Sequence, residues 1–112
     1  MNVSEKHIVK VAVVGLGQFG LKYINSLNSI PLVDVKWVVA RRLEQANQVA
    51  VDYNIKNGTD DLDHVLNDYE VDVVVVVTPE DTHREITVKA LESGKHVIVE
   101  KPLATNESDA EL

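Results

Sequence analysis

The sequence predicts an α/β domain, a doubly wound parallel sheet with the strand order 3-2-1-4-5. Apolar, β-branched segments alternate with segments of helical periodicity along the chain, which is typical of right-handed βαβ units. A glycine-rich turn, GLGQFG at residues 15–20, follows the first apolar segment and precedes a helical one. This is the position of the G-x-G-x-x-G turn in Rossmann folds, for which that strand order is usual.

The first half of the chain is expected to form two strands and two helices. The first strand runs from Ile8 to Val14, and a helix follows the glycines from Leu21 to Asn28, ahead of Pro31. The second strand, Val33 to Ala40, is mostly apolar and β-branched. The second helix, Leu43 to Tyr53, carries an apolar stripe that is expected to be buried: Leu43, Ala46, Val49, Ala50 and Tyr53.

The middle of the chain holds the clearest strand signal. Asn57-Gly58-Thr59 is either a turn or a very short third strand, and a short helix is expected from Asp61 to Asn67. The fourth strand is the run Val71 to Thr78. Because its valines are continuous and do not alternate with polar residues, it indicates a parallel strand that is covered on both faces.

The last expected helix has signals at both of its ends. Thr82-His83-Arg84-Glu85 has the spacing of a capping box, which predicts that the helix begins at Thr82, and Gly94 is expected to end it. Its inward-facing residues are expected to be Ile86, Ala90 and Leu91. His96 to Glu100 is the expected fifth strand.

Composition excludes several classes of protein. With 112 residues, the chain is expected to be a single domain spanning residues 1–112. Its net charge of −7 argues against a nucleic-acid or anionic-membrane surface. The absence of cysteine excludes disulfides, thiolate zinc sites and cysteine nucleophiles, and no histidine has a partner at metal-ligand spacing. No apolar run approaches the ~20 residues that span a bilayer, and the first residues lack the apolar core of a signal peptide, so a cytoplasmic protein is expected.

The glycine turn predicts a dinucleotide site. Its first glycine permits the tight turn, its second lets the backbone approach a pyrophosphate, and its third lets the helix pack close to the strand. The N–H groups at the start of the following helix then face the anion. The residues expected to contact the cofactor are Gly15, Gly17, Gln18, Phe19 and Gly20. The alternative is an ordinary turn whose glycines serve packing alone.

The end of the second strand indicates which dinucleotide is bound. NAD sites usually carry an acidic residue there, which accepts a hydrogen bond from the ribose 2′-hydroxyl. This chain has Ala40-Arg41-Arg42 instead, so no carboxylate repels a 2′-phosphate, and Arg41 and Arg42 can bind one. NADP is therefore the predicted cofactor, with NAD as the second choice. The alternative is a solvated arginine pair at the start of a helix, with Glu44 as its partner.

Two further segments are expected at the same edge of the sheet. Thr78-Pro79-Glu80-Asp81-Thr82-His83 follows the fourth strand, and Glu100-Lys101-Pro102 follows the fifth. In a doubly wound sheet the ligand crevice lies outside the carboxyl ends of the strands, where their order reverses. Both segments are therefore expected to meet the nicotinamide half of the cofactor.

These motifs resemble those of the Gfo/Idh/MocA oxidoreductases, the glucose–fructose oxidoreductase and inositol dehydrogenase family. The resemblance runs from VAVVGLGQFG to VVVVVTPEDTHREITVKALESGKHVIVEKPLAT and covers nearly the whole chain. It implies that Thr78, Pro79 and His83 line the cofactor crevice and that Glu100 bonds the nicotinamide ribose. It also implies that Lys101 contacts the cofactor and is catalytic, beside the reacting carbon–oxygen bond. The alternatives are a solvated pair of Glu100 and Lys101, and a His83 that only caps or packs.

The resemblance also implies a missing part. Family members carry a C-terminal α/β domain with substrate contacts and usually the catalytic histidine, so this chain is expected to be cut at its C-terminus and inactive alone. The complete enzyme is expected to pass hydride between nicotinamide and a sugar, polyol or related carbonyl compound. Apolar surface that the missing domain would cover is expected to favour self-association into a homo-oligomer. The alternative is a free-standing, non-catalytic nucleotide-binding or redox-sensing module.

Overall fold

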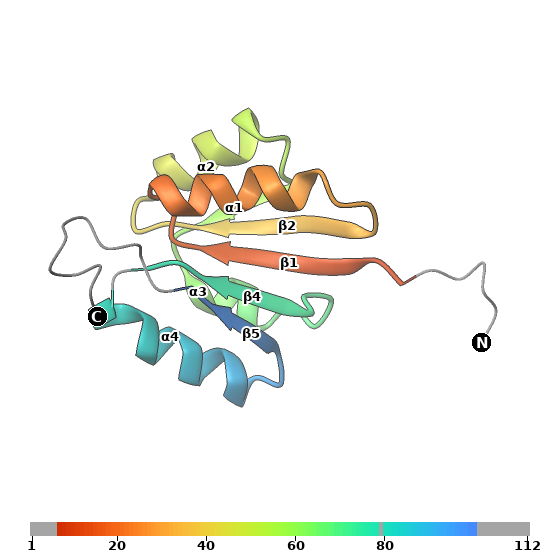
Figure 1. Ribbon diagram of the computed structural model, residues 1–112. Coiled ribbons are helices and arrows are strands. Elements are labelled where there is room, and N and C mark those ends of the chain that lie inside the picture. Colours follow the sequence, from red (N-terminus) through yellow and green to blue (C-terminus); the bar gives the residue numbers. More distant parts are fainter. Residues whose placement is uncertain (1–6, 79, 101–112) are drawn as a thin grey trace, which may run out of the picture.

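The computed structural model describes residues 7–78 and 80–100, and it confirms the predicted fold class (Figure 1). Within these residues, five parallel strands form one sheet in the order β3-β2-β1-β4-β5. The strands are β1 (Val9–Val14), β2 (Val33–Val39), β3 (Asn57–Thr59), β4 (Val73–Val76) and β5 (His96–Val99). The helices are α1 (Gln18–Asn28), α2 (Leu43–Asp52), α3 (Leu62–Leu66) and α4 (Glu80–Glu92). None of the helices in this part of the chain is long and apolar enough to cross a membrane.

The helices cover the sheet in pairs, with α1 and α2 on one face and α3 and α4 on the other (Figure 1). Neighbouring residues of a strand enter opposite layers, because Val13 belongs to the core cluster under α1 and α2 while Ala12 belongs to the other cluster. In β4, Val74, Val75 and Val76 are 0%, 1% and 0% exposed. The expectation that the valine run is covered on both faces is therefore confirmed.

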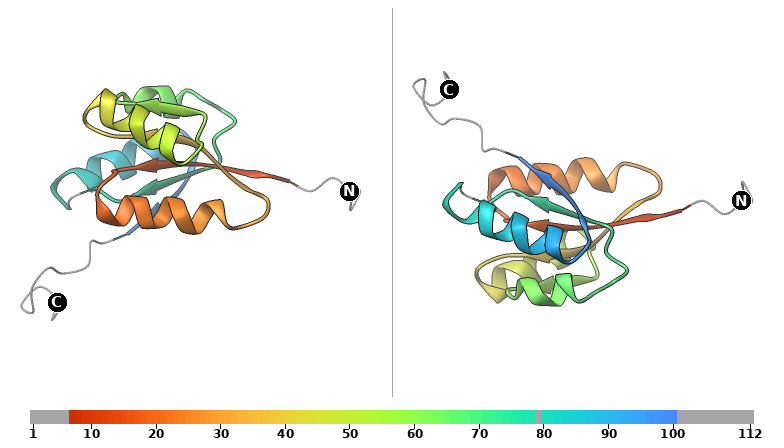
Figure 2. Two further views of the ribbon diagram at one scale, coloured as in Figure 1. Left: turned by 90° about the horizontal axis from the view of Figure 1, so that it is seen from above. Right: turned by 90° about the horizontal axis from the view of Figure 1, so that it is seen from below.

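The strand order reverses between β1 and β4, which pair in parallel from Val11 with Val73 to Val14 with Val76. The carboxyl ends of both strands lie at the same end of the sheet as the first turns of α1 and α4 (Figure 2). β3, which the sequence left open between turn and strand, is a strand that pairs with β2. The fold thus brings the segments that carry the predicted site to one edge of the sheet.

Two of the helices that begin at this edge, α1 and α4, begin earlier than the sequence predicts. α1 begins at Gln18 and not at Leu21, because Gly17 already occupies its N-cap position. α4 begins at Glu80, so Thr82 lies in its first turn and the predicted N-cap at Thr82 is wrong. Similar polar and acidic residues are common at the N-cap and in the first turn of a helix, so their spacing alone does not show which of the two positions Thr82 occupies.

Two predicted core positions are also wrong, because Leu43 is 47% and Leu91 is 56% exposed. Leu43 is the first residue of α2, and Leu91 lies in the last turn of α4. The remaining interior positions of these helices include Ala46 and Ala90, which are fully buried. A periodic pattern identifies the side of a helix that faces the sheet, but it does not show where along the helix the covered surface stops.

The edge strand β5 is the least covered strand of the sheet. Ile98 and Val99 are 48% and 40% exposed, and Val88 on the neighbouring α4 is 46% exposed. Exposed apolar surface at an edge strand favours self-association. The self-association itself stays a prediction.

Candidate functional site

The turn between β1 and α1 contains two glycines that the fold itself requires. Gly15 has a φ of +103°, and a Cβ there would lie 2.9 Å from the carbonyl oxygen of Val77. A Cβ on Gly20 would lie 1.9 Å from the carbonyl oxygen of Gly15. A larger residue at either position would force neighbouring backbone segments apart. Gly15 and Gly20 therefore have a packing role, whether or not a ligand binds.

Gly17 is different, because nothing in the described structure requires a glycine there. Its φ of −73° is ordinary for any residue, and a Cβ would meet no atom within 4 Å. Gly17 is the N-cap of α1 and lies beside the unpaired N–H groups of that helix. Open space beside a helix N-terminus suits a pyrophosphate that approaches the backbone closely. The open space at Gly17 and the adjacent start of α1 therefore fit the pyrophosphate of the predicted cofactor.

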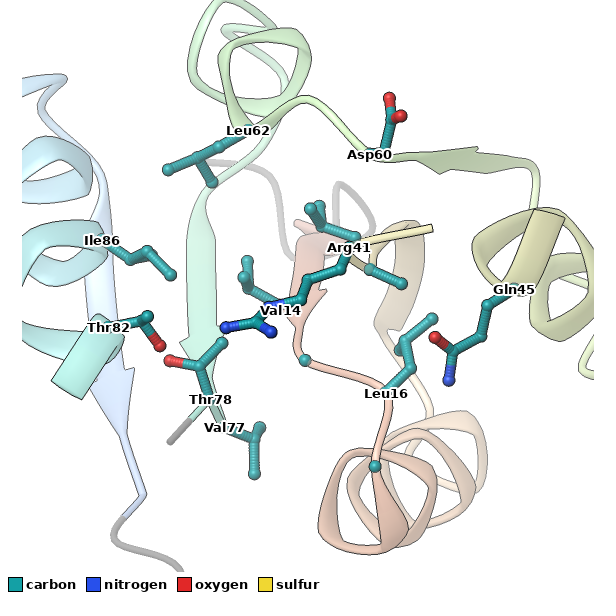
Figure 3. A pocket seen from close by; sticks show the side chains of 14 residues that line it. Val14, Leu16, Arg41, Gln45, Asp60, Leu62, Val77, Thr78, Thr82 and Ile86 are labelled. Atoms are coloured by element: carbon teal, nitrogen blue, oxygen red, sulfur yellow. The ribbon is translucent and has the colours of Figure 1, made fainter. Parts of the chain in front are cut away.

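Gly17 borders a cavity of about 650 Å³ at the carboxyl ends of β1, β2 and β4 (Figure 3). Its wall is mostly apolar, with a few polar side chains from separate elements, as is usual in small-molecule sites. The wall residues that the sequence analysis named are Gly15, Gly17, Arg41 and Thr78. Thr82 is also in the wall, and the sequence analysis included it in the segment expected at this edge. Among the wall residues that it missed are Leu16, Gln45, Asp60, Leu62 and Ile86.

Arg41 reaches into the cavity, whereas Arg42 is not part of its wall. The side chain of Arg41 extends from the end of β2 toward Thr78 (Figure 3). Arg42 Nε lies 3.4 Å from Glu44 Oε1, and the two side chains are 75% and 81% exposed. Arg42 thus matches the alternative of a solvated pair at the start of α2. The two neighbouring arginines have separate environments, and Arg41 is the better placed to meet a ligand.

Asp60 contributes a carboxylate to the same cavity. It directly follows β3, whose last residue, Thr59, pairs with Val39 at the end of β2. Figure 3 shows the carboxylate of Asp60 turned away from Arg41. The sequence analysis missed Asp60 because residues 57–59 could be a turn or a strand. Had the strand been assigned, its carboxyl end would have placed Asp60 at the ligand edge.

Two buried polar atoms near the end of β4, Thr78 Oγ1 and His83 Nδ1, have no hydrogen-bond partner among the described residues. Leaving a buried polar atom unpaired costs about 1–3 kcal/mol, so each atom is suited to a further partner. Thr78 lies in the wall of the cavity, as predicted. His83 borders a second cavity of about 410 Å³, together with Val99 of β5. The structure therefore does not bring His83 and Thr78 to the same cavity.

Glu100 is held by one backbone and one side-chain hydrogen bond. Its N–H donates to the carbonyl oxygen of Val76 at 3.0 Å, next to the end of β4. Its carboxylate accepts a hydrogen bond from the hydroxyl of Tyr23 on α1. That bond, followed by burial, raises the pKa of Tyr23 to about 12. The sequence analysis missed Tyr23 because nothing local to α1 relates it to a residue after β5.

Four predicted site residues are described in part or not at all. Pro79 and Lys101 lie outside the described residues, so the cofactor contacts of both and the catalytic role of Lys101 stay predictions. The backbones of Gln18 and Phe19 form the start of α1, but their side chains lie outside the described part of the structure. Within residues 7–78 and 80–100, no three His, Asp or Glu side chains are grouped closely enough to hold a metal ion.

Comparisons with known proteins identify the family of this chain. The profile of the GFO_IDH_MocA family, described as an oxidoreductase family with an NAD-binding Rossmann fold, matches residues 9–112. The chain is 38% identical over 99 residues to the scyllo-inositol 2-dehydrogenase (NAD(+)) of Bacillus subtilis, an alignment that covers 88% of this chain and 29% of that enzyme. It spans between 29% and 33% of the length of the first two curated relatives that it matches.

Two solved structures of similar fold carry different cofactors. GenD2 from gentamicin A biosynthesis, in complex with NAD, aligns with a TM-score of 0.81 and 36% identity over 95% of this chain and 30% of GenD2. KijD10, a 3-ketoreductase from Actinomadura kijaniata in complex with TDP-benzene and NADP, aligns with a TM-score of 0.78 and 30% identity over 92% of this chain and 33% of KijD10. Proteins similar to this chain therefore bind NAD or NADP.

Proposed function

Because the chain belongs to the Gfo/Idh/MocA oxidoreductase family, we propose that it is the cofactor-binding part of a dehydrogenase that transfers hydride between a nicotinamide dinucleotide and a sugar, polyol or related carbonyl compound. The observation that carries the proposal is the open space at Gly17. Packing explains Gly15 and Gly20, but it gives no reason for a glycine whose Cβ would meet no atom. A pyrophosphate lying against the backbone gives that reason.

The two halves of the cofactor are proposed to lie on either side of Gly17. Arg41, at the end of β2, is proposed to bind the adenosine half, for which its side chain turns from the position near Thr78 that it has in Figure 3. Thr78 and Glu100 are proposed to bind the nicotinamide half. When bound, nicotinamide supplies the carbon that accepts or donates hydride. Glu100 accepts hydrogen bonds from the ribose hydroxyls, and Thr78 Oγ1 gains a partner that it lacks among the described residues. Lys101, the next residue after Glu100, is proposed to bond the substrate oxygen and to stabilise charge that develops there.

Within this proposal NADP is favoured over NAD. A guanidinium binds a phosphate by charge-assisted hydrogen bonds, and Arg41 extends into the cavity from the end of β2. Asp60 supports NAD as the second candidate, because a carboxylate in the wall can accept from a ribose hydroxyl and repels a 2′-phosphate. Its carboxylate is turned away from Arg41 (Figure 3), so Arg41 carries the greater weight.

A calorimetric titration with NADPH and NADH at one fixed ionic strength tests the proposal. We expect the chain to bind at least one of them, and Gly17→Ala to weaken that binding at least tenfold because its methyl group takes space that the pyrophosphate needs. The free energy of unfolding should change by less than about 1 kcal/mol, since the new Cβ meets no atom in the free chain.

The matched control is Ser26→Ala, at an exposed position on the same helix, which should bind like the wild type. Equal affinities of Gly17→Ala and the wild type would overturn the pyrophosphate assignment. A wild-type chain that binds neither nucleotide would overturn the proposed function for this chain.

A further inference from the structure

The hydrogen bond between Tyr23 and Glu100 joins two distant parts of the chain at the candidate site. Tyr23 lies on α1, the helix that begins at the glycine turn, and Glu100 directly follows β5. The two residues are 77 positions apart in the sequence. The hydroxyl of Tyr23 donates to the Oε2 atom of Glu100. The helix that borders the proposed pyrophosphate position is thereby linked to the residue proposed to bind the nicotinamide ribose.

The ring and the hydroxyl of Tyr23 have separable roles. The side chain packs against the core cluster under α1 and α2, a contact that a phenylalanine ring would also make. The hydroxyl makes the bond to Glu100. That bond, followed by burial, raises the pKa of Tyr23 to about 12, so the hydroxyl stays a donor at neutral pH and well above it. Substitution by phenylalanine therefore removes the donor while it preserves the packing.

A glutamate at the end of a strand has several side-chain rotamers, and only some of them direct its carboxylate to a given ligand. A hydrogen bond that already holds the carboxylate in the free protein reduces the conformational freedom that ligand binding must remove. The backbone of Glu100 is held in the same way by its bond to Val76. These two hydrogen bonds hold both the backbone and the carboxylate of Glu100 in place at the edge where the cofactor is proposed to bind.

We propose that Tyr23 is a positioning residue, whose hydroxyl holds the Glu100 carboxylate in the orientation in which it binds the ribose of the nicotinamide half. This inference rests on the proposed function, because it assigns a consequence to the Glu100–ribose contact. It predicts that the hydroxyl contributes to the affinity for the nicotinamide half and contributes nothing to the affinity for the adenosine half.

The test is a calorimetric titration of wild-type and Tyr23→Phe chains with NADPH, NADH and the adenosine halves 2′,5′-ADP and AMP. Tyr23→Phe should weaken the tighter-binding dinucleotide about fivefold and leave the affinity for the adenosine half unchanged. Tyr53→Phe is the matched control, because Tyr53 is partly buried against the same core cluster. It should bind all four ligands like the wild type. A general loss of structure would instead weaken the dinucleotide and its adenosine half together, which would overturn the inference.

Variants of Glu100 show whether Tyr23 acts through it. Glu100→Ala should weaken dinucleotide binding, and adding Tyr23→Phe to it should cause no further loss. A further fivefold loss in the double variant would overturn the positioning role. If Glu100→Ala weakens binding and Tyr23→Phe does not, the inference fails while the proposed function stands. If the wild-type chain binds neither dinucleotide, the proposed function fails and this inference fails with it.

Discussion

The two ends of the sheet differ in whether their buried polar groups have hydrogen-bond partners. Around the amino ends of β4 and β5, buried and partly buried polar groups have protein partners. Lys95 is 7% exposed, and its Nζ donates to the carbonyl oxygens of Asp68 and Val71 at 2.9 and 3.1 Å. The carboxylate of Asp68 accepts from Trp37 Nε1 at 2.8 Å and lies 2.7 Å from Lys36 Nζ.

At the carboxyl end some polar groups are paired, as Glu100 is with Tyr23, but two buried polar atoms are not. Thr78 Oγ1 and His83 Nδ1 are buried with no partner among the described residues, and Arg41 extends into the cavity. Because unpaired buried polar atoms lower stability, we infer that these two atoms serve a ligand and not the fold. The contrast indicates that the polar groups at the amino end stabilise the sheet, while those at the carboxyl end fit the binding role proposed for them.

The largest expected effect is at the amino end. Lys95→Met keeps the length of the side chain but leaves the carbonyl oxygens of Asp68 and Val71 without their donor. We expect the free energy of unfolding in urea to fall by about 2–4 kcal/mol, while the affinity of the folded chain for NADPH stays unchanged. The matched control is Lys89→Met, since Lys89 is exposed and forms an ion pair with Glu85 on the same helix, and it should cost less than about 0.5 kcal/mol. Equal stability of the two variants would contradict the claim that the hydrogen bonds of Lys95 stabilise the amino end.

The amino end should also respond to acid. Burial acts to raise the pKa of Asp68, but hydrogen bonds from Lys36 and Trp37 outweigh it and lower the pKa to about 2 from an ordinary value of 3.8. Because the folded-state pKa lies below the unfolded one, the ionised carboxylate stabilises the fold above about pH 4, and that stabilisation is lost as the pH falls toward 2. We expect a loss of about 1–2 kcal/mol in urea unfolding between about pH 5 and pH 2.

Asp68→Asn is the control for this acid response. It should be less stable than the wild type at about pH 5, because the amide cannot form the ion pair with Lys36. It should lose less stability than the wild type on acidification. Parallel curves of stability against pH for the two proteins would show that Asp68 is not the titrating group.

At the carboxyl end, the two neighbouring arginines test whether the position of a positive charge determines cofactor binding. Arg41→Asp should weaken NADPH binding at least tenfold, about 1.4 kcal/mol, because it replaces the guanidinium proposed to bind the 2′-phosphate with a carboxylate that repels it. NADH binding should change less. Arg42→Asp makes the same charge change outside the cavity and should alter NADPH affinity less than about threefold. Equal losses in the two variants would show that general charge, and not the position of Arg41, attracts the cofactor.

The smallest expected effect concerns the unpaired hydroxyl of Thr78. Thr78→Val removes it with little change in shape, so the free chain should become more stable by about 0.5–1 kcal/mol. NADPH binding should weaken about two- to threefold through loss of the proposed hydrogen bond. Thr87→Val is the matched control, because Thr87 Oγ1 donates to the carbonyl oxygen of His83 at 2.6 Å and its removal should not stabilise the chain. A Thr78→Val chain that is less stable than the wild type would contradict the contrast between the two ends.

Much of the fold could be predicted from local sequence patterns. The valine run of β4 and the glycine turn after β1 are local signals, and chirality then leaves few ways to arrange the helices and strands. The predictions failed where a local pattern does not report its surroundings, as with the exposed Leu43 and Leu91 and the expected N-cap at Thr82. In each case the residue type and spacing suited the predicted role, but the neighbouring segments determined whether the residue took that role.

The sequence by itself determined the strand order and the edge of the sheet at which the cavity lies. It also placed Gly15, Gly17, Arg41 and Thr78 at that edge. These follow from periodicity, from glycine stereochemistry and from the handedness of βαβ units. Only the tertiary structure decided that Arg41 faces the cavity while Arg42 pairs with Glu44, and that Tyr23 holds Glu100. Such contacts depend on side-chain direction and on the packing of segments far apart in the chain, which no local pattern encodes.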